Sequence, residues 1–261
     1  MKKLENKVAI VTASITGIGQ SSLKKLAEHG AKVYLAAHLK EESMAVVSAL
    51  CEEGLDAKYV YFNALDATTH SAMIEEVVKQ EGRIDILVNN YGGTDSKKDF
   101  DLLTGDSEAF FKIIRTNLES VYLTSKAAIP YMMKQGGGSI VNISSIGAIV
   151  PDLSKMAYAV SKATINALTQ NIALQYARAG VRCNAIMPGL TATPAAMNNL
   201  SDDFLQSFLR HVPMGRMATP EDIANAVLYY ASDDAAFVTG MLHTVAGGYA
   251  LGTPQYSDFI D

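Results

Sequence analysis

Short apolar segments alternate with longer amphipathic segments from the first residues of the chain almost to its end. The short segments are rich in branched side chains, which is typical of buried β-strands. The longer segments repeat apolar residues at helical spacing, most clearly over residues 107–133 and 156–179. The pattern predicts strands at residues 8–12, 32–36, 57–62, 84–88, 139–143, 181–186 and 240–244.

The connections between these segments predict how the strands pair. Parallel strands need a crossover of a dozen or more residues, usually a helix, and each connection here is long enough. No Pro/Gly/Ser-rich linker and no internal repeat divides the sequence. We therefore predict one α/β domain over residues 1–261, a doubly wound, Rossmann-like parallel sheet with helices on both faces. In such a sheet, ligands bind at the carboxyl ends of the strands.

The two long helical segments carry apolar residues on more than one face. These residues are Phe110, Phe111, Ile113 and Val121 in the first segment and Ala163, Ile165, Leu168 and Ile172 in the second. A helix of this kind is either enclosed by its own domain or buried against another chain. We expect a homo-oligomer.

Composition and charge argue against several classes of function. Hydrophobic residues make up 49% of the chain and charged residues 19%, a balance that supports a sizeable folded core. The net charge of -5, without a cluster of Lys and Arg, argues against binding to nucleic acid or to an anionic membrane. The first residues lack an apolar secretion signal and no apolar run reaches membrane-spanning length, so we expect a cytoplasmic protein.

The cysteines and histidines suggest no metal chemistry. Cys51 and Cys183 are isolated, without the C-x-x-C spacing of a zinc or redox site, and both are predicted to be buried free thiols. The five histidines are scattered without ligand spacing, so we expect no bound metal.

A glycine-containing turn follows the first predicted strand and leads directly into a helical segment. Residues 12–19 are Thr-Ala-Ser-Ile-Thr-Gly-Ile-Gly. The glycines let the backbone approach a pyrophosphate, and the helix N-terminus offers free N–H groups and a positive dipole end. Two such glycines also serve packing alone, so the turn by itself is a weak signal. Its candidate cofactor-binding residues are Ser14, Thr16, Gly17, Ile18 and Gly19.

A tyrosine and a lysine four positions apart lie in the second long helical segment. Tyr158 and Lys162 would share one helix face, with the ammonium beneath the phenol. Because positive charge favours phenolate, we expect a lowered pKa for Tyr158 and a proton donor and acceptor that works near neutral pH. Ser145 offers a hydroxyl that can hold a substrate oxygen, and Ser144 is the alternative for that role.

These motifs occur in the order typical of a known family. The chain resembles the short-chain dehydrogenase/reductase family over essentially its whole length. The resemblance is carried by the turn at 12–19, Asn-Asn-Tyr-Gly at 89–92, Asn117, the set Ser145, Tyr158 and Lys162, and Pro188-Gly189. Ala13 and Tyr91 depart from the family pattern, which has glycine and alanine there. We expect Ala13 to have a negative φ, which would let the turn keep its function.

The resemblance implies an enzyme that interconverts a secondary alcohol and a ketone with NAD or NADP. It implies a catalytic tetrad of Asn117, Ser145, Tyr158 and Lys162, in which Asn117 positions the lysine and a water relay. It also implies a homotetramer. The remaining cofactor contacts that it implies are Asn63 and Ala64 at the adenine, Asn90 and Gly92 at the ribose, Tyr158 and Lys162, and Pro188, Gly189, Thr191 and Thr193 at the nicotinamide.

The choice between the two cofactors depends on the end of the second predicted strand. An acidic residue there would bind the ribose hydroxyls of NAD and repel the 2′-phosphate of NADP. Ala37 occupies this position, followed by His38 and Lys40, which could contact a phosphate. Thr16 and His38 stand where NADP-preferring relatives often have Arg. The sequence therefore favours NADP and leaves NAD open.

The segment just after Pro188-Gly189 is a candidate substrate lid, at about residues 190–215. It carries apolar residues at helical spacing, namely Phe204, Leu205, Phe208 and Leu209. A mobile lid with an apolar inner face would suit a large hydrophobic alcohol, and plain core packing would give the same stripe.

Five segments extend the resemblance to the bacterial bile-acid 7α-hydroxysteroid dehydrogenases. They are residues 3–8, 89–92, 195–198, 211–213 and 247–256. The implied reaction is reversible oxidation of a steroid 7α-hydroxyl. The alternatives are a hydroxysteroid dehydrogenase acting at the 12α- or 3-position, a reductase of β-ketoacyl thioesters or other small ketones, and a nucleotide-binding protein without catalysis.

Overall fold

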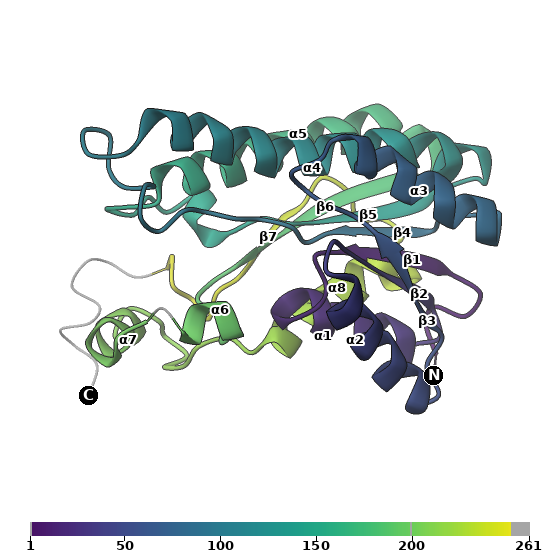
Figure 1. Ribbon diagram of the computed structural model, residues 1–261, viewed down its shortest axis with the longest axis horizontal. Coiled ribbons are helices and arrows are strands. Elements are labelled where there is room, and N and C mark those ends of the chain that lie inside the picture. Colours follow the sequence, from purple (N-terminus) through teal and green to yellow (C-terminus); the bar gives the residue numbers. More distant parts are fainter. Residues whose placement is uncertain (1, 199, 252–261) are drawn as a thin grey trace.

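The computed structural model describes residues 2–198 and 200–251, which contain one seven-stranded parallel sheet (Figure 1). The strand order is β3-β2-β1-β4-β5-β6-β7. The predicted doubly wound α/β class is confirmed. The strands are β1 (Val8–Thr12), β2 (Lys32–Ala37), β3 (Ala57–Tyr61), β4 (Ile86–Asn89), β5 (Gly138–Ile143), β6 (Val181–Pro188) and β7 (Leu242–Val245).

Helices cover both faces of this sheet. Helices α1 (Gly17–Glu28), α2 (Lys40–Glu52) and α8 (Pro220–Ala231) pack on one face, and α3 (Thr68–Glu81), α4 (Ser107–Lys134) and α5 (Met156–Tyr176) pack on the other (Figure 1). The shorter elements are α6 (Pro194–Met197), α7 (Asp202–Leu209) and the 3-10 helices η1 (Ile146–Ala148), η2 (Ala177–Ala179) and η3 (Asp233–Ala235).

The apolar character of the central strands follows from this double cover. All five residues of β1 are buried. Because side chains alternate across a strand, Ala9 and Val11 join the apolar cluster beneath α1 and α8, whereas Val8 and Ile10 join the cluster beneath α3 and α4. A strand buried on both faces has no polar face, which explains why its sequence is a continuous apolar run.

The fourth strand begins later than the apolar pattern predicts, because a side chain takes the place of a backbone partner from a neighbouring strand. Ile84 was expected to begin the fourth strand, which starts at Ile86. Ile84 is buried, yet its N–H is bonded to the Gln135 side chain at 3.3 Å, and the N–H of Asp85 is bonded to the Val8 carbonyl at 2.9 Å. Burial and ladder pairing are separate properties, and the apolar pattern reports only the first.

The two cysteines differ in exposure. Cys183 on β6 is buried, but Cys51 on α2 is exposed, so the prediction of two buried thiols is wrong for Cys51. Helix α2 buries Ser43, Val47 and Leu50 against the sheet, and the position after Leu50 turns away from that stripe.

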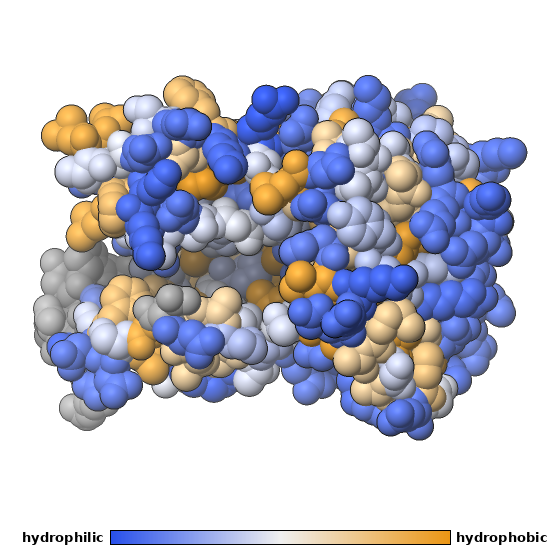
Figure 2. All heavy atoms as spheres, in the orientation of Figure 1, coloured by the Kyte–Doolittle hydropathy of each residue, from blue (hydrophilic) through white to orange (hydrophobic). Residues whose placement is uncertain are grey.

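The carboxyl ends of β1 and β4 form the switch point of the sheet, from which successive strands proceed in opposite directions. Sheets of this type bind ligands in the crevice at that point. Residues 189–198 and 200–215, with α6 and α7, follow β6 beyond this same edge (Figure 1). Figure 2 shows the face hollowed between this segment and the layer of α4 and α5.

None of the helices in residues 2–198 and 200–251 has the length and apolar content needed to cross a lipid bilayer. In the same residues, no three side chains of His, Cys, Asp or Glu are grouped as a metal site would require.

Candidate functional site

The turn between β1 and α1 contains a residue in an unusual backbone conformation. Ala13 has a φ of 51°, in the left-handed region, so the prediction of a negative φ there is wrong. The Ala13 N–H is bonded to the Ala36 carbonyl at 2.7 Å, and its carbonyl accepts from the Asn90 side chain at 2.9 Å. These bonds, from Ala36 on β2 and from Asn90 just after β4, hold the residue in a conformation that a side chain disfavours.

Ala13→Gly is therefore expected to raise the free energy of unfolding by about 0.5–1 kcal/mol, because glycine adopts a positive φ without the Cβ penalty. Ala49→Gly is the matched control. Ala49 is exposed inside helix α2, where glycine should destabilise by about 1 kcal/mol. Urea unfolding of both variants measures the difference. A destabilised Ala13→Gly protein would show that the turn is not strained.

The N-terminus of α1 has the features of an anion site. Thr16 is the N-cap residue, but its side chain caps no N–H, and the first turn holds no acidic residue. The free N–H groups and the dipole therefore face the crevice. Gly17 has a φ of 59°, and a Cβ on it would lie 3.0 Å from the Thr193 methyl group. The residues present thus fit the pyrophosphate of a dinucleotide.

Gly19 and Ser14 pack on the inner side of the same turn. A Cβ on Gly19 would lie 2.5 Å from the Asn90 amide nitrogen and 2.7 Å from the Ala13 carbonyl oxygen, so no larger residue fits without rearrangement. Ser14 is buried, and its hydroxyl donates to the Val11 carbonyl at 2.7 Å. The half-buried Ile18 packs against the core on the α1 side of the sheet.

The ends of β2 and β3 lie next to this turn. Ala37 is buried at the end of β2, whereas His38 and Lys40 are exposed beyond it. Asn63 follows β3, and its side-chain oxygen accepts from the Leu65 N–H at 3.0 Å; Ala64 is buried between them. The carboxylates nearest in the sequence to this strand end are Glu41 and Glu42, which lie in the first turn of α2.

The Asn-Asn-Tyr-Gly segment at the end of β4 joins the predicted cofactor turn to the predicted catalytic residues. The Thr12 hydroxyl accepts from the N–H of Asn90 at 2.9 Å. At Gly92, a Cβ would overlap the Lys162 ammonium nitrogen and lie 2.9 Å from the Lys162 Cε. Tyr91, where the family pattern has alanine, packs against the core beneath α3 and α4. The absence of a side chain at Gly92 therefore leaves the space that the end of the Lys162 side chain occupies.

Three predicted catalytic residues converge beyond β5. Ser145 is the N-cap residue of η1, and Tyr158 and Lys162 lie in the first turns of α5. The Lys162 ammonium lies 5.6 Å from the centre of the Tyr158 ring and donates to the Ile143 carbonyl at 2.8 Å. The Ser144 hydroxyl donates to the Lys162 carbonyl at 3.1 Å and is buried, which favours Ser145 as the residue that meets a substrate.

Burial dominates the electrostatics of this pair. It raises the pKa of Tyr158, and a hydrogen bond with Ser145 opposes this rise only in part. The expected lowering of the Tyr158 pKa is therefore wrong for the protein alone, since removal of water disfavours the phenolate. Burial also lowers the pKa of Lys162 to about 8.

Asn117 on α4 binds the chain next to the tyrosine and lysine. Its side chain accepts from the Gly93 N–H and donates to the Gly93 carbonyl, both at 2.9 Å, and it also donates to the Ser161 hydroxyl at 2.9 Å. The Ser161 hydroxyl in turn donates to the Tyr158 carbonyl at 2.7 Å. Asn117 thus links the loop after β4 to the helix that bears Tyr158.

The residues after β6 face the crevice from its other side. Pro188 is the last residue of β6, and the Gly189 N–H is bonded to the Val245 carbonyl at 2.9 Å. The buried Thr191 donates to the Gly189 carbonyl at 3.0 Å, and Thr193 caps α6 through its hydroxyl. Thr193 also meets the turn at Gly17, so the two halves of the predicted cofactor site lie together.

The predicted lid segment has an aromatic stack. Phe208 on α7 stacks on Tyr249 with ring centres 4.6 Å apart, and Phe204 lies 6.0 Å from Phe208. A cavity of about 180 Å³ lies behind the segment, lined by Leu190, Val212, Met214, Arg216, Ala218, Asp222, Val245, Ala246 and Gly247. Residues 252–256 of the distinctive C-terminal segment, and Asn199, lie outside the described residues.

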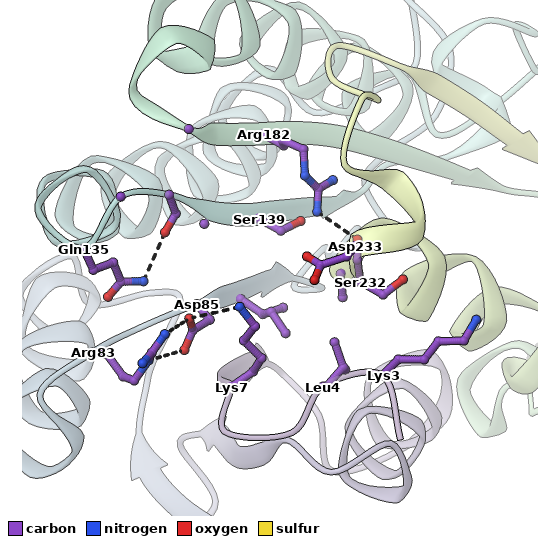
Figure 3. A pocket seen from close by; sticks show the side chains of 16 residues that line it. Lys3, Leu4, Lys7, Arg83, Asp85, Gln135, Ser139, Arg182, Ser232 and Asp233 are labelled. Carbon is purple, nitrogen blue, oxygen red and sulfur yellow. Dashed lines mark hydrogen bonds and ion pairs between the residues drawn. The ribbon is translucent and has the colours of Figure 1, made fainter. Parts of the chain in front are cut away.

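A larger cavity lies at the opposite edge of the sheet (Figure 3). It measures about 260 Å³ and lies at the amino ends of β4, β5 and β6, where Lys7 and Arg83 pair with Asp85. It contains none of the predicted catalytic or cofactor residues. The crevice at the carboxyl ends is therefore the candidate site, because the complementary groups converge there.

One residue that the sequence patterns did not indicate belongs to this site. Asp99, between β4 and α4, is only 4% exposed, and its carboxylate accepts from the N–H groups of Ala157 and Tyr158. Asp95 and Asp101 lie nearby in the sequence, and nothing in the local pattern separates the three.

Comparisons with known proteins agree with this geometry. A family model described as enoyl-(acyl carrier protein) reductase matches residues 12–250. The chain is 60% identical over 259 residues to a 7α-hydroxysteroid dehydrogenase of Clostridium sardiniense, covering 99% of each chain. It is 50% identical over 261 residues to the enzyme of that name from Paraclostridium sordellii, covering 100% of this chain and 98% of the other. It also resembles the structure of a short-chain dehydrogenase/reductase from Mycobacterium ulcerans, with a TM-score of 0.90 at 28% identity over 95% of this chain and 90% of the other.

Proposed function

The chain belongs to the short-chain dehydrogenase/reductase family of NAD(P)-dependent oxidoreductases, and we propose that it interconverts a 7α-hydroxyl and a 7-ketone on a bile acid. The observation that carries the substrate is the 60% identity, over 99% of both chains, to a 7α-hydroxysteroid dehydrogenase. The observation that carries the chemistry is the convergence of Ser145, Tyr158 and Lys162 at the crevice.

Tyr158 is the proposed proton donor and acceptor. A bound nicotinamide supplies or accepts the hydride. The raised pKa keeps the Tyr158 phenol protonated at neutral pH, which suits donation to the carbonyl oxygen during ketone reduction. In oxidation the phenol must first lose its proton, so the oxidation rate should increase with pH. Ser145, whose hydroxyl acts to lower the pKa of the Tyr158 phenol, would hold the substrate oxygen beside it.

Lys162 and Asn117 would support the proton transfer. The Lys162 ammonium lies over the Tyr158 ring and stabilises negative charge there. Its lowered pKa, about 8, allows it to exchange a proton near neutral pH. Asn117 fixes Gly93 and Ser161, and through them the backbone around Tyr158. These two residues therefore act on the phenol rather than on the substrate carbon.

The cofactor turn would hold the pyrophosphate through the α1 N-terminus and Gly17, and the residues after β6 would hold the nicotinamide. We propose NADP as the preferred cofactor. The support is the buried, uncharged Ala37 at the end of β2 and the exposed His38 and Lys40 beside it. The Lys40 ammonium and the His38 ring would lie near a 2′-phosphate, and the position that would carry the NAD-selecting carboxylate is the uncharged Ala37.

Ala37→Asp is expected to shift the ratio of kcat/KM for NADP to that for NAD by at least about tenfold toward NAD, because the carboxylate repels the 2′-phosphate and accepts from the ribose hydroxyls. Ala37→Asn is the matched control, since it is similar in shape but carries no charge. The ratio does not depend on the fraction of folded enzyme. An unchanged ratio in Ala37→Asp would place the ribose elsewhere.

The segment at about residues 190–215 is the proposed substrate lid. The support is the stack of Phe204, Phe208 and Tyr249 and the neighbouring hollow between α6–α7 and the α4–α5 layer (Figure 2). A rigid, apolar steroid nucleus would bury its surface against such aromatic rings.

The test of the function is cofactor reduction by purified protein with bile acids that differ only in their 3-, 7- and 12-hydroxyls, with NAD and NADP offered separately. Turnover confined to substrates with a 7α-hydroxyl is the expected result. Turnover confined to the 3- or 12-hydroxyl would show that the enzyme acts at that carbon instead of carbon 7. No turnover of any of these bile acids would favour the reduction of β-ketoacyl thioesters or other small ketones.

The exposed apolar side chains of α4 and α5 support a homo-oligomer. Phe111 on α4 is 69% exposed and Leu174 on α5 is 84% exposed, although both helices are long and otherwise buried on the sheet side. A second copy of the chain would remove these residues from water. Light scattering during size-exclusion chromatography measures the state, for which a tetramer is expected.

A further inference from the structure

We propose that Asp99 is a positioning residue that holds Tyr158 in its reactive place by capping helix α5 from a distant loop. Residues 155–158 are the start of this helix, and each of their four N–H groups is bonded to Asp99 or to its neighbour Phe100. The expected effect of Asp99 on turnover rests on the proposed function, whereas its role as the cap of α5 does not.

The cap consists of the carboxylate and the backbone of the same residue. One carboxylate oxygen accepts from the Ala157 N–H at 2.8 Å, and the other accepts from the Tyr158 N–H at 3.1 Å. The Asp99 carbonyl accepts from the Lys155 N–H at 3.0 Å. Lys155 itself is the N-cap residue, with a left-handed φ of 56°, and its side chain caps nothing. The helix therefore depends on Asp99 for its first turn.

The carboxylate is buried without a cation. It is 4% exposed and forms no ion pair with Lys, Arg or His in the part of the chain that the structure describes. Burial of a charge is costly unless hydrogen bonds and dipoles compensate for it. The two N–H groups, the Thr94 hydroxyl at 2.6 Å and the positive end of α5 supply that compensation. Because the charge requires these partners, it fixes their positions strongly.

This cap is connected to Asn117 by a short run of chain. Asn117 binds both backbone groups of Gly93, and Thr94, the next residue, donates to Asp99. Asp99 then binds Tyr158, while Ser161 connects the Tyr158 carbonyl back to Asn117. The loop after β4 thus closes a ring of hydrogen bonds around the first turns of α5. Loss of the cap would free the backbone of Tyr158 while Lys162 stays bound to Ile143.

Asp99→Ala is expected to lower kcat by about 10–100-fold, because small displacements of a reacting group cost rates of this order. The kcat is to be expressed per cofactor-binding site titrated by fluorescence, so that loss of folded protein does not contribute. KM for the cofactor should stay unchanged. Asp99→Asn keeps one acceptor oxygen but places its NH2 group against the N–H of either Ala157 or Tyr158, so its kcat should lie between those of Asp99→Ala and the natural protein.

Asp106→Ala is the matched control. Asp106 caps α4 through its side chain, with the Ala109 N–H at 2.7 Å, and among the described residues its side chain forms no hydrogen bond with α5. It should lower stability without lowering kcat per titrated site. Equal kcat values for Asp99→Ala and Asp106→Ala would overturn the positioning role.

Amide hydrogen exchange tests the cap independently of any substrate. In Asp99→Ala, the amides of Ala157 and Tyr158 should exchange at least about tenfold faster, with little change in the later turns of α5. Unchanged exchange would overturn the inference. Faster exchange in a protein whose natural form is inactive toward hydroxysteroids would retain the cap and reject the proposed function.

Discussion

Tyr158→Phe should lower turnover by about 10³-fold, because phenylalanine keeps the ring and its packing but cannot donate or accept the proton. The phenol lies beside Ser145, and the Lys162 ammonium lies 5.6 Å from the centre of its ring, so the phenol oxygen is the proposed point of proton transfer. Steady-state kinetics in both directions measure the loss, and fluorescence titration checks that cofactor affinity changes little.

Tyr176→Phe is the matched control for this variant. Tyr176 is the last residue of the same helix and packs against the core far from the crevice, so its hydroxyl has no part in the reaction. Its kcat should equal that of the natural protein. Near-normal activity in Tyr158→Phe would remove the tyrosine from the proposed mechanism.

Gly92→Ala should lower kcat by about 10²-fold with little loss of stability. An added Cβ would overlap the Lys162 ammonium and lie 2.9 Å from its Cε. The end of a lysine side chain is flexible, so the ammonium would move away while the fold remains. The expected consequence is loss of the positive charge over the Tyr158 ring and of the bond to the Ile143 carbonyl.

A double-mutant cycle separates this cause from a direct effect on the ribose. If Gly92→Ala acts by displacing Lys162, it should add little to Lys162→Ala, and the two single losses should not sum. Additive losses would mean that Gly92 acts through cofactor binding instead. Cofactor affinity, measured by fluorescence on all three variants, gives the same distinction without turnover.

Most of the fold could be predicted from the sequence, because the period of apolar residues reports local burial. The first strand was predicted with its observed bounds, and the long helices were predicted to within a few residues of α4 and α5. One departure arises at Ile84, where the Gln135 side chain supplies the partner that a neighbouring strand would otherwise provide. A local pattern contains no information about a partner fifty residues away.

The candidate site was predictable only to the extent that its residues form local motifs. The spacing of Tyr158 and Lys162 on one helix predicted that the ammonium lies near the ring, and the glycines marked the turn that is proposed to hold the cofactor. The pKa of Tyr158 was predicted in the wrong direction, because spacing indicates the charge nearby but not the loss of water around it.

The sequence by itself determined the layered α/β architecture, the family and the identity of the candidate catalytic residues, since periodicity and short motifs express local geometry. Only the tertiary structure decided the left-handed Ala13, the contact of Gly92 with Lys162 and the cap that Asp99 places on α5. Each of these depends on segments brought together from different strands and helices. Such contacts follow from the packing of the whole chain, and no local pattern of residues records them.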